Sequence, residues 1–413
     1  MSKEQIVTGI DIGSTKVVIT VGTLKEGMID IIGVSKKPNS GVRKGIITDI
    51  EETVSAITAA LDEAERMAGV PVNSAYASIS GTHINCVQSK GIIAVSRADG
   101  EISEVDIERV IEAARAVAMP PNQEILHIIP QFFNIDGQTE QVKDPLGMSG
   151  VRLEVSVEVI GGSASAIRNL TKCVNQAGLE INNLIFTPLA TSQILLSKKQ
   201  KEVGVILLDI GSSTTEMAVF EEGNLIHAKV FPIGSSYITN DIAIGLRTTI
   251  EAAEKIKIKY ANAEAGKIKE TEEIKLSSFD PTSENKISKK YIAEIVEARL
   301  IEIFCMVKDE LKNIKRDGLL PAGVILSGGG SKLHGIVEFS KEYLRLPTQI
   351  GCPLIEVSGM VDKLDDPVYT ASVGLMLKGL EDNSEGKKEG IQFHPSVDKI
   401  VDKAKDIFKH FMP

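Results

Sequence analysis

The sequence predicts an α/β fold of two lobes, because one strand-turn-strand motif occurs twice and strands alternate with helices after each copy. The first copy is Asp-Ile-Gly-Ser-Thr-Lys at 11–16 and the second is Asp-Ile-Gly-Ser-Ser-Thr at 209–214. The apolar runs around each copy are short, rich in β-branched residues and bounded by glycine, which favours strands over helices. A third apolar run at 324–326 leads through Ser327 into a triple glycine at 328–330. We therefore expect two similar lobes that face one ligand.

Length and composition fit a soluble globular protein with more than one domain. The chain has 413 residues, of which 43% are hydrophobic and 25% charged, and its net charge of -10 argues against a nucleic-acid partner. The four cysteines and six histidines are widely spaced, which indicates reduced thiols and no transition-metal site. No apolar run reaches the roughly 18 residues of a transmembrane helix. The first residues lead directly into a predicted strand, so we expect a cytosolic protein.

The bend of each hairpin has the chemistry of a phosphate site. Its glycine, serine and threonine residues leave backbone N–H groups and hydroxyls exposed, and such a bend can cradle a phosphate. The aspartate that ends each first strand, Asp11 or Asp209, would hold Mg²⁺ directly or through water. An ordinary turn explains a single copy equally well. Two copies in comparable surroundings predict hairpins that clamp a triphosphate from both sides.

The first lobe is predicted to have a core at 1–81 and 162–200 and a small α+β insertion at 82–161. Within the insertion, Ser103 is followed three residues later by an acid, which is the spacing of a capping box at the start of a helix. After the insertion, we expect Ser163 to cap the next helix of the core.

The second lobe is predicted to have a core at 201–235 and 317–380 with a subdomain at 236–316. We expect Thr248 to open a helix of this subdomain, because an acid follows three residues later. The stretch 261–290 is polar and rich in lysine and glutamate, which predicts a mobile surface segment.

Two features of the second lobe point to the nucleoside end of the ligand. The triple glycine is predicted to open a helix at Leu333, where the backbone can approach a ligand closely. Glu254 and Lys257 are three residues apart and share one helix face, from which they can reach ribose hydroxyls. A surface ion pair explains the same spacing. The spacing alone fits both explanations.

The C-terminal residues predict a flexible linker at 381–395 and an amphipathic helix at 396–413. The apolar residues of this helix fall in one arc, and its lysines lie on both flanks with aspartates between them. The candidate membrane-inserting residues are Ile400, Val401, Ile407, Phe408 and Phe411. The alternative is a helix docked on the protein's own core, but a helix on a polar tether is poorly placed there. The pattern favours an in-plane membrane helix that binds weakly as one copy and strongly in an assembly.

These motifs together resemble one superfamily and one family within it. The two hairpins, the triple glycine and the segment 367–375 are similar to those of the superfamily of actin, the heat-shock chaperones and the sugar kinases. The insertion segments 125–131 and 144–154 resemble the subdomain that the FtsA family of bacterial cell-division proteins carries in place of an actin subdomain. The resemblance covers nearly the whole chain. It implies an actin-like two-lobed ATPase fold with duplicated βαβ lobes.

The resemblance also implies a function and a set of partners. An FtsA-like protein would bind ATP, polymerise, and anchor the tubulin-like FtsZ to the cytoplasmic face of the cell membrane at the division septum, beside other division proteins. Lys289, Lys290 and Arg299 are our candidates for contacts with the C-terminal peptide of FtsZ, expected to be acidic.

The nucleotide contacts follow from the matching motifs. Asp11 and Asp209 would hold Mg²⁺ through its waters, and Glu254 and Lys257 would face the ribose. The residues that would meet the phosphates are Gly13, Ser14, Thr15, Lys16, Gly211, Ser212, Ser213 and Thr214. Gly328, Gly329 and Gly330 would face the adenine.

One position departs from the superfamily pattern. Many members place a glutamate before the Pro-Leu-Ala connection to position the attacking water, and this chain has Thr187 there. Threonine is no useful base at neutral pH, so we expect ATP binding with weak or slow hydrolysis. A sugar kinase would need an acidic base, and a heat-shock chaperone would need a substrate domain after the ATPase body. The nearest alternative is a PilM-like pilus-assembly ATPase, which ordinarily lacks an amphipathic tail.

Overall fold

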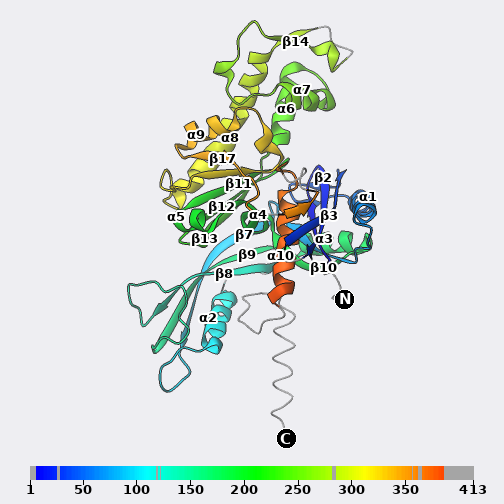
Figure 1. Cartoon of the computed structure of the whole chain (residues 1–413). Helices are drawn as coiled ribbons and strands as arrows, with labels where there is room; N and C mark the ends of the chain where they lie inside the picture. The colour runs from blue at the N-terminus through cyan, green and yellow to red at the C-terminus, as the bar shows by residue number, and fades with distance from the viewer. Residues whose placement is uncertain are drawn as a thin grey trace.

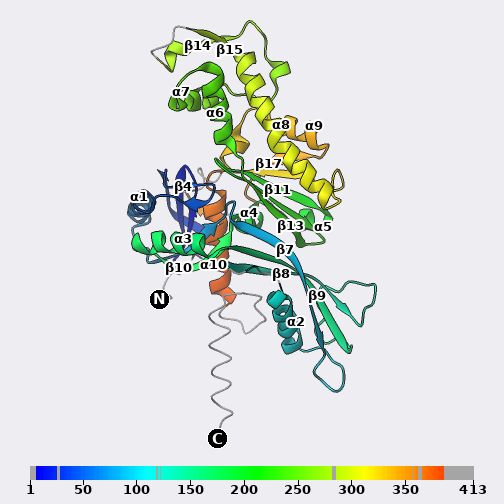
Figure 2. The same ribbon diagram turned by 180° about the vertical axis from the view of Figure 1, so that it is seen from behind.

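The computed structural model describes residues 6–25, 28–117, 120, 122–280, 285–355, 357–360 and 365–385. Figures 1 and 2 show two sheet-based lobes, a helical subdomain at the far end of the second lobe, and an insertion that projects away from both lobes. The predicted membrane helix at 396–413 and the predicted linker beyond residue 385 lie outside the described residues. Within the described part of the chain, no helix has the length and apolar character needed to cross a membrane.

Lobe one is built on a six-stranded sheet with the order β10-β6-β1-β2-β3-β18. Its strands are β1 (Ile6–Ile12), β2 (Lys16–Lys25), β3 (Met28–Pro38), β6 (Ser74–Ile79), β10 (Glu180–Phe186) and β18 (Val357–Gly359). The antiparallel pair of β1 and β2 is the predicted first hairpin, while β6 runs parallel to both β1 and β10. A separate two-stranded hairpin joins β4 (Val42–Arg43) and β5 (Ile46–Ile47).

Helices pack around this sheet and bury its central strands. The helices of lobe one are α1 (Ile50–Ala68), α3 (Ala164–Gln176), α4 (Thr187–Leu195) and α10 (Thr370–Glu385). Helix α1 packs on β2 and β3, α10 packs on β1 and β6, and α4 packs against α10. A Cβ atom on Gly9 would lie 2.0 Å from the carbonyl oxygen of Ser372, so α10 crosses β1 at a distance that requires glycine.

Lobe two repeats the hairpin in a five-stranded sheet with the order β13-β12-β11-β16-β17. Its strands are β11 (Val205–Ile210), β12 (Thr215–Glu221), β13 (Asn224–Phe231), β16 (Val324–Ser327) and β17 (Thr348–Ile350). Its helices and 3₁₀ turns, including those of the subdomain, are α5 (Lys198–Val203), α6 (Ser235–Leu246), α7 (Ile250–Tyr260), η1 (Ala265–Lys267), η2 (Leu276–Ser278), α8 (Lys289–Asn313), η3 (Gly329–Lys332) and α9 (Ile336–Leu344). The pair of β11 and β12 is the predicted second hairpin.

The insertion is a separate layer with its own small core. Its antiparallel sheet has the order β7-β9-β8, formed by β7 (Ile84–Ala94), β9 (Arg152–Ser163) and β8 (Gln123–Ile135), and α2 (Glu104–Val117) packs on β7 and β9. The predicted capping box is confirmed: Ser103 N donates to Asp106 Oδ2 at 3.1 Å, and Asp106 N donates to Ser103 Oγ at 3.4 Å.

One strand of the insertion is hydrogen-bonded to both lobes. In β8, the imidazole Nε2 of His127 accepts a 3.0 Å hydrogen bond from the backbone N–H of Phe186 at the end of β10. Four residues further along, Gln131 Nε2 donates to the carbonyl oxygen of Leu225 in β13 at 3.1 Å. The Asn224 side chain donates in turn to the carbonyl oxygen of Gln131 at 2.7 Å. Burial lowers the pKa of His127 to about 4, so its ring is neutral and remains an acceptor.

Three predictions about the second lobe were wrong. The segment 357–380 was assigned to its core, but β18 joins the sheet of lobe one and α10 packs on β1 and β6. The triple glycine does not open a helix at Leu333: it leads into η3, and α9 begins only after Gly335, whose φ of 80° breaks the helical path. The described residues of 261–290 are not a loose segment, because β14 (Glu273–Lys275) pairs with β15 (Lys286–Ser288) there. Ile274 and Leu276 anchor this hairpin in the buried core of lobe two.

Three helix ends also differ from prediction. Thr249 caps α7 by accepting a hydrogen bond from Ala252 N, while Thr248 donates to Asp280. Ser163 stands before α3 without a capping hydrogen bond. Residues 381–385, predicted as the start of the linker, belong to α10.

Candidate functional site

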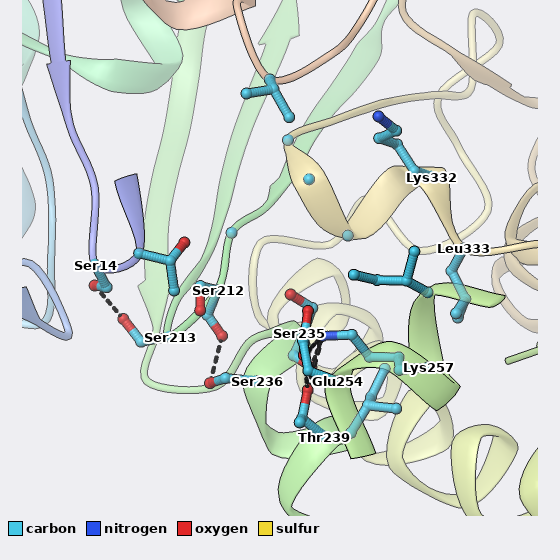
Figure 3. Close-up of a pocket in the computed structure, with 18 of the residues that line it drawn as sticks. Ser14, Ser212, Ser213, Ser235, Ser236, Thr239, Glu254, Lys257, Lys332 and Leu333 are labelled. Atoms are coloured by element: carbon cyan, nitrogen blue, oxygen red, sulfur yellow. Dashed lines mark hydrogen bonds and ion pairs between the residues drawn. The ribbon is translucent and has the colours of Figure 1, made fainter. Parts of the chain in front are cut away.

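A cavity of about 1150 Å³ lies between the lobes and extends under the subdomain of lobe two. Both hairpin turns, the triple glycine, the start of α6 and the inner face of α7 line it (Figure 3). The predicted site residues on its wall are Asp11, Gly13, Ser14, Thr15, Lys16, Asp209, Gly211, Ser212, Ser213, Thr214, Glu254, Lys257, Gly328, Gly329 and Gly330. Residues from four distant parts of the sequence thus share one concave surface.

The two hairpin turns have the same backbone geometry and touch each other. In the first turn Gly13 N donates to the carbonyl oxygen of Lys16 at 2.9 Å, and in the second Gly211 N donates to that of Thr214 at 2.9 Å. Between the turns, the hydroxyls of Ser14 and Ser213 are 2.6 Å apart and share one hydrogen bond, which Figure 3 shows as a dashed line. The lobes are therefore in direct contact at the place where both turns present their hydroxyls.

The two aspartates lie at the inner end of the cavity. The Ser78 hydroxyl donates to Asp11 Oδ1 at 2.8 Å. Burial raises the pKa of Asp11, against the opposing effects of this hydrogen bond and of Lys16. Burial, followed by the nearby charge of Asp11, raises the pKa of Asp209 to about 6. Burial also lowers the pKa of Lys16, so these charges share one poorly solvated region.

A third carboxylate, Glu216, belongs to this region and was missed in the sequence. It stands directly opposite Asp209 in the β11–β12 pair, is 7% exposed, and lines the cavity. Burial, followed by the charge of Asp209, raises the pKa of Glu216 to about 8. A comparison of the two motif copies residue by residue would have found it, because the first copy has Val18 at the corresponding position.

The triple glycine packs tightly against the second hairpin. Gly328 has a φ of 78°, and a Cβ atom there would lie 2.3 Å from Asp209 Oδ1. A Cβ atom on Gly330 would lie 2.4 Å from a methyl carbon of Ile210, and one on Gly329 would lie 3.3 Å from Lys16 Nζ. Glycine is therefore required at Gly328 and Gly330 by close approach, and Gly329 borders the lysine of the opposite lobe.

Glu254 and Lys257 form both an ion pair and part of the cavity wall. Lys257 Nζ lies 2.7 Å from Glu254 Oε2 and donates to Thr239 Oγ1 at 2.8 Å. The Thr239 hydroxyl in turn donates to Glu254, which closes a three-residue network (Figure 3). The network fixes a carboxylate and an ammonium group side by side on the cavity wall, and Thr239 was not predicted from the sequence.

The three candidate peptide-binding residues are not gathered in one patch. Lys289 lines the cavity and pairs with Glu272 at 3.0 Å, whereas Lys290 pairs with Glu270 at 2.7 Å. Arg299 is ten residues further along α8, roughly 15 Å at 1.5 Å per residue, and pairs with Asp241 at 2.6 Å.

Thr187 occupies the position at which many members of the superfamily carry a glutamate. It begins α4, lines the cavity and is 8% exposed. Its hydroxyl is 3.5 Å from the carbonyl oxygen of Ile79, and it offers no carboxylate to the cavity.

The donor groups fit a hydrated Mg²⁺ ion better than a metal enclosed by protein. Among the described residues, no three histidine, cysteine, aspartate or glutamate side chains converge closely enough to hold a metal ion directly. Mg²⁺ usually keeps several waters and binds through one or two carboxylates and substrate phosphates. Asp11 and Asp209, beside exposed turn hydroxyls, match that pattern.

The arrangement of the lobes defines the fold class. A chain of the PilM-PilN type IV pilus biogenesis complex aligns with a TM-score of 0.66 at 16% identity, over 91% of this chain and 98% of that one. MreB5 of Spiroplasma citri bound to ADP aligns with a TM-score of 0.55 at 13% identity, over 94% and 99%. These neighbours confirm the predicted actin-like ATPase fold, and at such identities they show the fold alone.

The sequence comparisons identify the family. The model of cell division protein FtsA matches residues 206–374, and the model of the SHS2 domain inserted in FtsA matches residues 81–161. FtsA of Pseudomonas aeruginosa is 42% identical over 92% of this chain and 91% of its own length. FtsA of Bacillus subtilis is 37% identical over 91% and 84%, and FtsA of Escherichia coli is 33% identical over 93% and 93%. The chain belongs to the FtsA family of cell division proteins.

Proposed function

We propose that this chain binds ATP with Mg²⁺ between its lobes, polymerises, and tethers FtsZ to the cytoplasmic face of the membrane at the division septum. The observation that carries the nucleotide proposal is the meeting of two matched hairpins and a triple glycine on one cavity. The structures of MreB5 with ADP and of MreB 5 with AMPPNP, which share the fold, support it.

Each part of the cavity has a proposed role. The turn hydroxyls, the turn N–H groups and Lys16 bind the phosphates, and the glycines Gly328 to Gly330 leave room for the base. Glu254 and Lys257 hold the ribose through the network with Thr239. Asp11 and Asp209 hold the Mg²⁺ ion through water, and the ion supplies positive charge beside the phosphates.

Hydrolysis is proposed to be slow, so that the nucleotide mainly controls assembly. Thr187 is buried at the start of α4 and supplies no carboxylate for the attacking water. Calorimetry with ATP and Mg²⁺ should show binding at one site per chain, and a phosphate-release assay should show turnover far below that of a metabolic kinase. Absence of nucleotide binding would overturn the proposal, and fast multiple turnover would overturn the slow-hydrolysis part.

The FtsZ contact is proposed to lie at α8. Lys289, Lys290 and Arg299 are all paired with carboxylates, and an acidic peptide would compete with those carboxylates for them. A pull-down with the C-terminal peptide of FtsZ tests this contact. The double change Lys289→Ala and Lys290→Ala should weaken capture, while Lys312→Ala at the other end of α8 should not. Equal capture by all variants would place the peptide elsewhere.

The membrane contact is proposed to be the segment 396–413, on its sequence pattern alone. Pelleting with liposomes should bring down the intact chain, most strongly under conditions in which it polymerises. A chain that ends at residue 395 should remain in the supernatant. If the shortened chain pelleted as well as the intact one, the membrane proposal would fail.

A further inference from the structure

Glu216 is a buried acid that the hairpin fold itself does not need. In the antiparallel pairs, Asp11 stands opposite Val18 and Asp209 stands opposite Glu216. Both hairpins close with the same turn hydrogen bond of 2.9 Å. Because valine at this position allows the same hairpin in lobe one, the hairpin does not require an acid there.

The position of Glu216 is costly without a ligand. Directly opposed residues of an antiparallel pair point to the same face with Cβ atoms about 5 Å apart, and like charges there are destabilising. Glu216 is 7% exposed, and its Oε2 atom has no hydrogen-bond partner. A buried carboxylate oxygen without a donor loses its hydration without replacement.

Ionisation of all the carboxyl groups at the inner end of the cavity would leave its charges unbalanced. Asp11, Asp209 and Glu216 bring three carboxylates to this end, and Lys16 is the ammonium group whose charge acts on the two aspartates. A hydrated divalent cation would balance the negative charge of the carboxylates. One of its water molecules would also donate a hydrogen bond to the unpaired Oε2 atom of Glu216.

We propose that Glu216 is a positioning residue of the metal site, which accepts a hydrogen bond from a water molecule bound to the Mg²⁺ ion that accompanies the nucleotide. The inference rests on the proposed ATP site. It adds a third carboxylate from β12 to the two aspartates, acting through water rather than by direct ligation.

The test measures the Mg²⁺ requirement of nucleotide binding rather than hydrolysis. The affinity of the full chain for ATP is determined by calorimetry across a range of free Mg²⁺ concentrations and again in EDTA. Loss of a group that orients a metal ligand typically costs 10-fold to 100-fold in metal affinity. Glu216→Gln should therefore raise the Mg²⁺ midpoint about 10-fold and leave the affinity in EDTA unchanged. Glu216→Asp, which keeps the carboxylate, should shift the midpoint less.

Glu221→Gln is the matched control, because Glu221 lies on the same strand but pairs with Arg316 outside the cavity. Its Mg²⁺ midpoint should equal that of the unmodified chain. A Glu216→Gln midpoint equal to that of the unmodified chain would overturn the inference, as would an equal shift in Glu221→Gln. Failure of the unmodified chain to bind ATP at any Mg²⁺ concentration would instead overturn the proposed function.

If Glu216→Gln did not fold, the Mg²⁺ midpoint of Glu216→Asp would serve as the test of the inference. A midpoint raised over that of Glu221→Gln supports the role, and an equal one contradicts it.

Discussion

The two hairpins have one backbone design and different charged side chains. Both turns close with a 2.9 Å hydrogen bond, and in both the preceding strand has an aspartate as its penultimate residue. The first carries Lys16 and Val18, where the second carries Thr214 and Glu216. The backbone thus provides two equal turns, while the side chains add a lysine to lobe one and a second acid to lobe two.

The hairpins also differ in what supports them. The side chain of Asn39 donates to the carbonyl oxygen of Gly13 at 2.8 Å, which anchors the first turn from within lobe one. The second turn is held by the start of α6: Ser235 N donates to the carbonyl oxygen of Gly211 at 2.9 Å, and Ser236 donates to that of Ser212 through both its N–H and its Oγ, each at 2.8 Å. The start of α6 is thereby fixed to the second turn, so movement of this turn must reach the subdomain of lobe two.

The largest expected effect concerns the triple glycine, which packs on the second hairpin. Gly328→Ala places a Cβ atom 2.3 Å from Asp209 Oδ1 and 2.7 Å from the carbonyl oxygen of Ile210. Together with a φ of 78°, this should lower the free energy of unfolding by about 3 kcal/mol in urea denaturation. Gly318→Ala is the control: its φ is 71° and its Cβ would have nothing within 4 Å, so a loss of about 1 kcal/mol is expected. Equal losses would show that the close approach is unimportant.

The second prediction separates the phosphate contacts of the two hairpins. Lys16→Ala removes a charged donor and should weaken ATP binding about 30-fold, or roughly 2 kcal/mol. Thr214→Val at the corresponding position removes a neutral hydroxyl and should cost about 1 kcal/mol. Lys25→Ala, at the far end of the same strand as Lys16, should leave the affinity unchanged in calorimetry. Similar losses for Lys16 and Thr214 would contradict the difference in charge.

The third prediction concerns how the stability of the ligand-free chain depends on pH. The folded chain raises the pKa of Glu216 from 4.5 to about 8, so the folded state retains a proton that the unfolded state has released. The free energy of unfolding should therefore fall as the pH rises between these values. Glu216→Val, which copies the first hairpin, should flatten this slope in urea denaturation at several pH values. A slope unchanged by the substitution would assign the pH dependence to other groups.

The smallest effect is expected for the contact between the hairpins. The Ser14 and Ser213 hydroxyls, 2.6 Å apart, should show a coupling energy of about 1 kcal/mol in a double-mutant cycle of Ser14→Ala and Ser213→Ala. Saturating ATP with Mg²⁺ should reduce the coupling, because both hydroxyls would then donate to phosphate oxygens. Additive effects in the ligand-free chain would show that the contact contributes nothing to closure.

The sequence predicted most of the elements that carry the site. Local signals sufficed for both hairpins and for the capping box at Ser103, because short apolar runs and fixed spacings determine them. The start of α9 was missed because the sequence does not show which glycine adopts a left-handed backbone conformation, as Gly335 does just before α9 begins. The β14–β15 hairpin was missed because its few apolar residues, such as Ile274, lie between many charges.

The site residues that were missed depend on tertiary contacts. Thr239 comes from α6 and meets Glu254 and Lys257 of α7 only after the two helices pack. Glu216 was missed because it lies at the start of an apolar strand. Its significance arises from Asp209, which stands opposite it in the sheet, rather than from its neighbours in sequence.

The attachment of β8 to both lobes makes the insertion a lever. The two attachment points, His127 and Gln131, are four residues apart, or roughly 13 Å along the strand. A relative displacement of the lobes by ~1 Å at these points would turn the strand by about 4°. Beyond Gln131 the strand continues to Ile135, roughly another 13 Å, so its end would move about twice as far as Gln131. A small change in the width of the cleft would thus be amplified into a larger swing at the far end of the insertion.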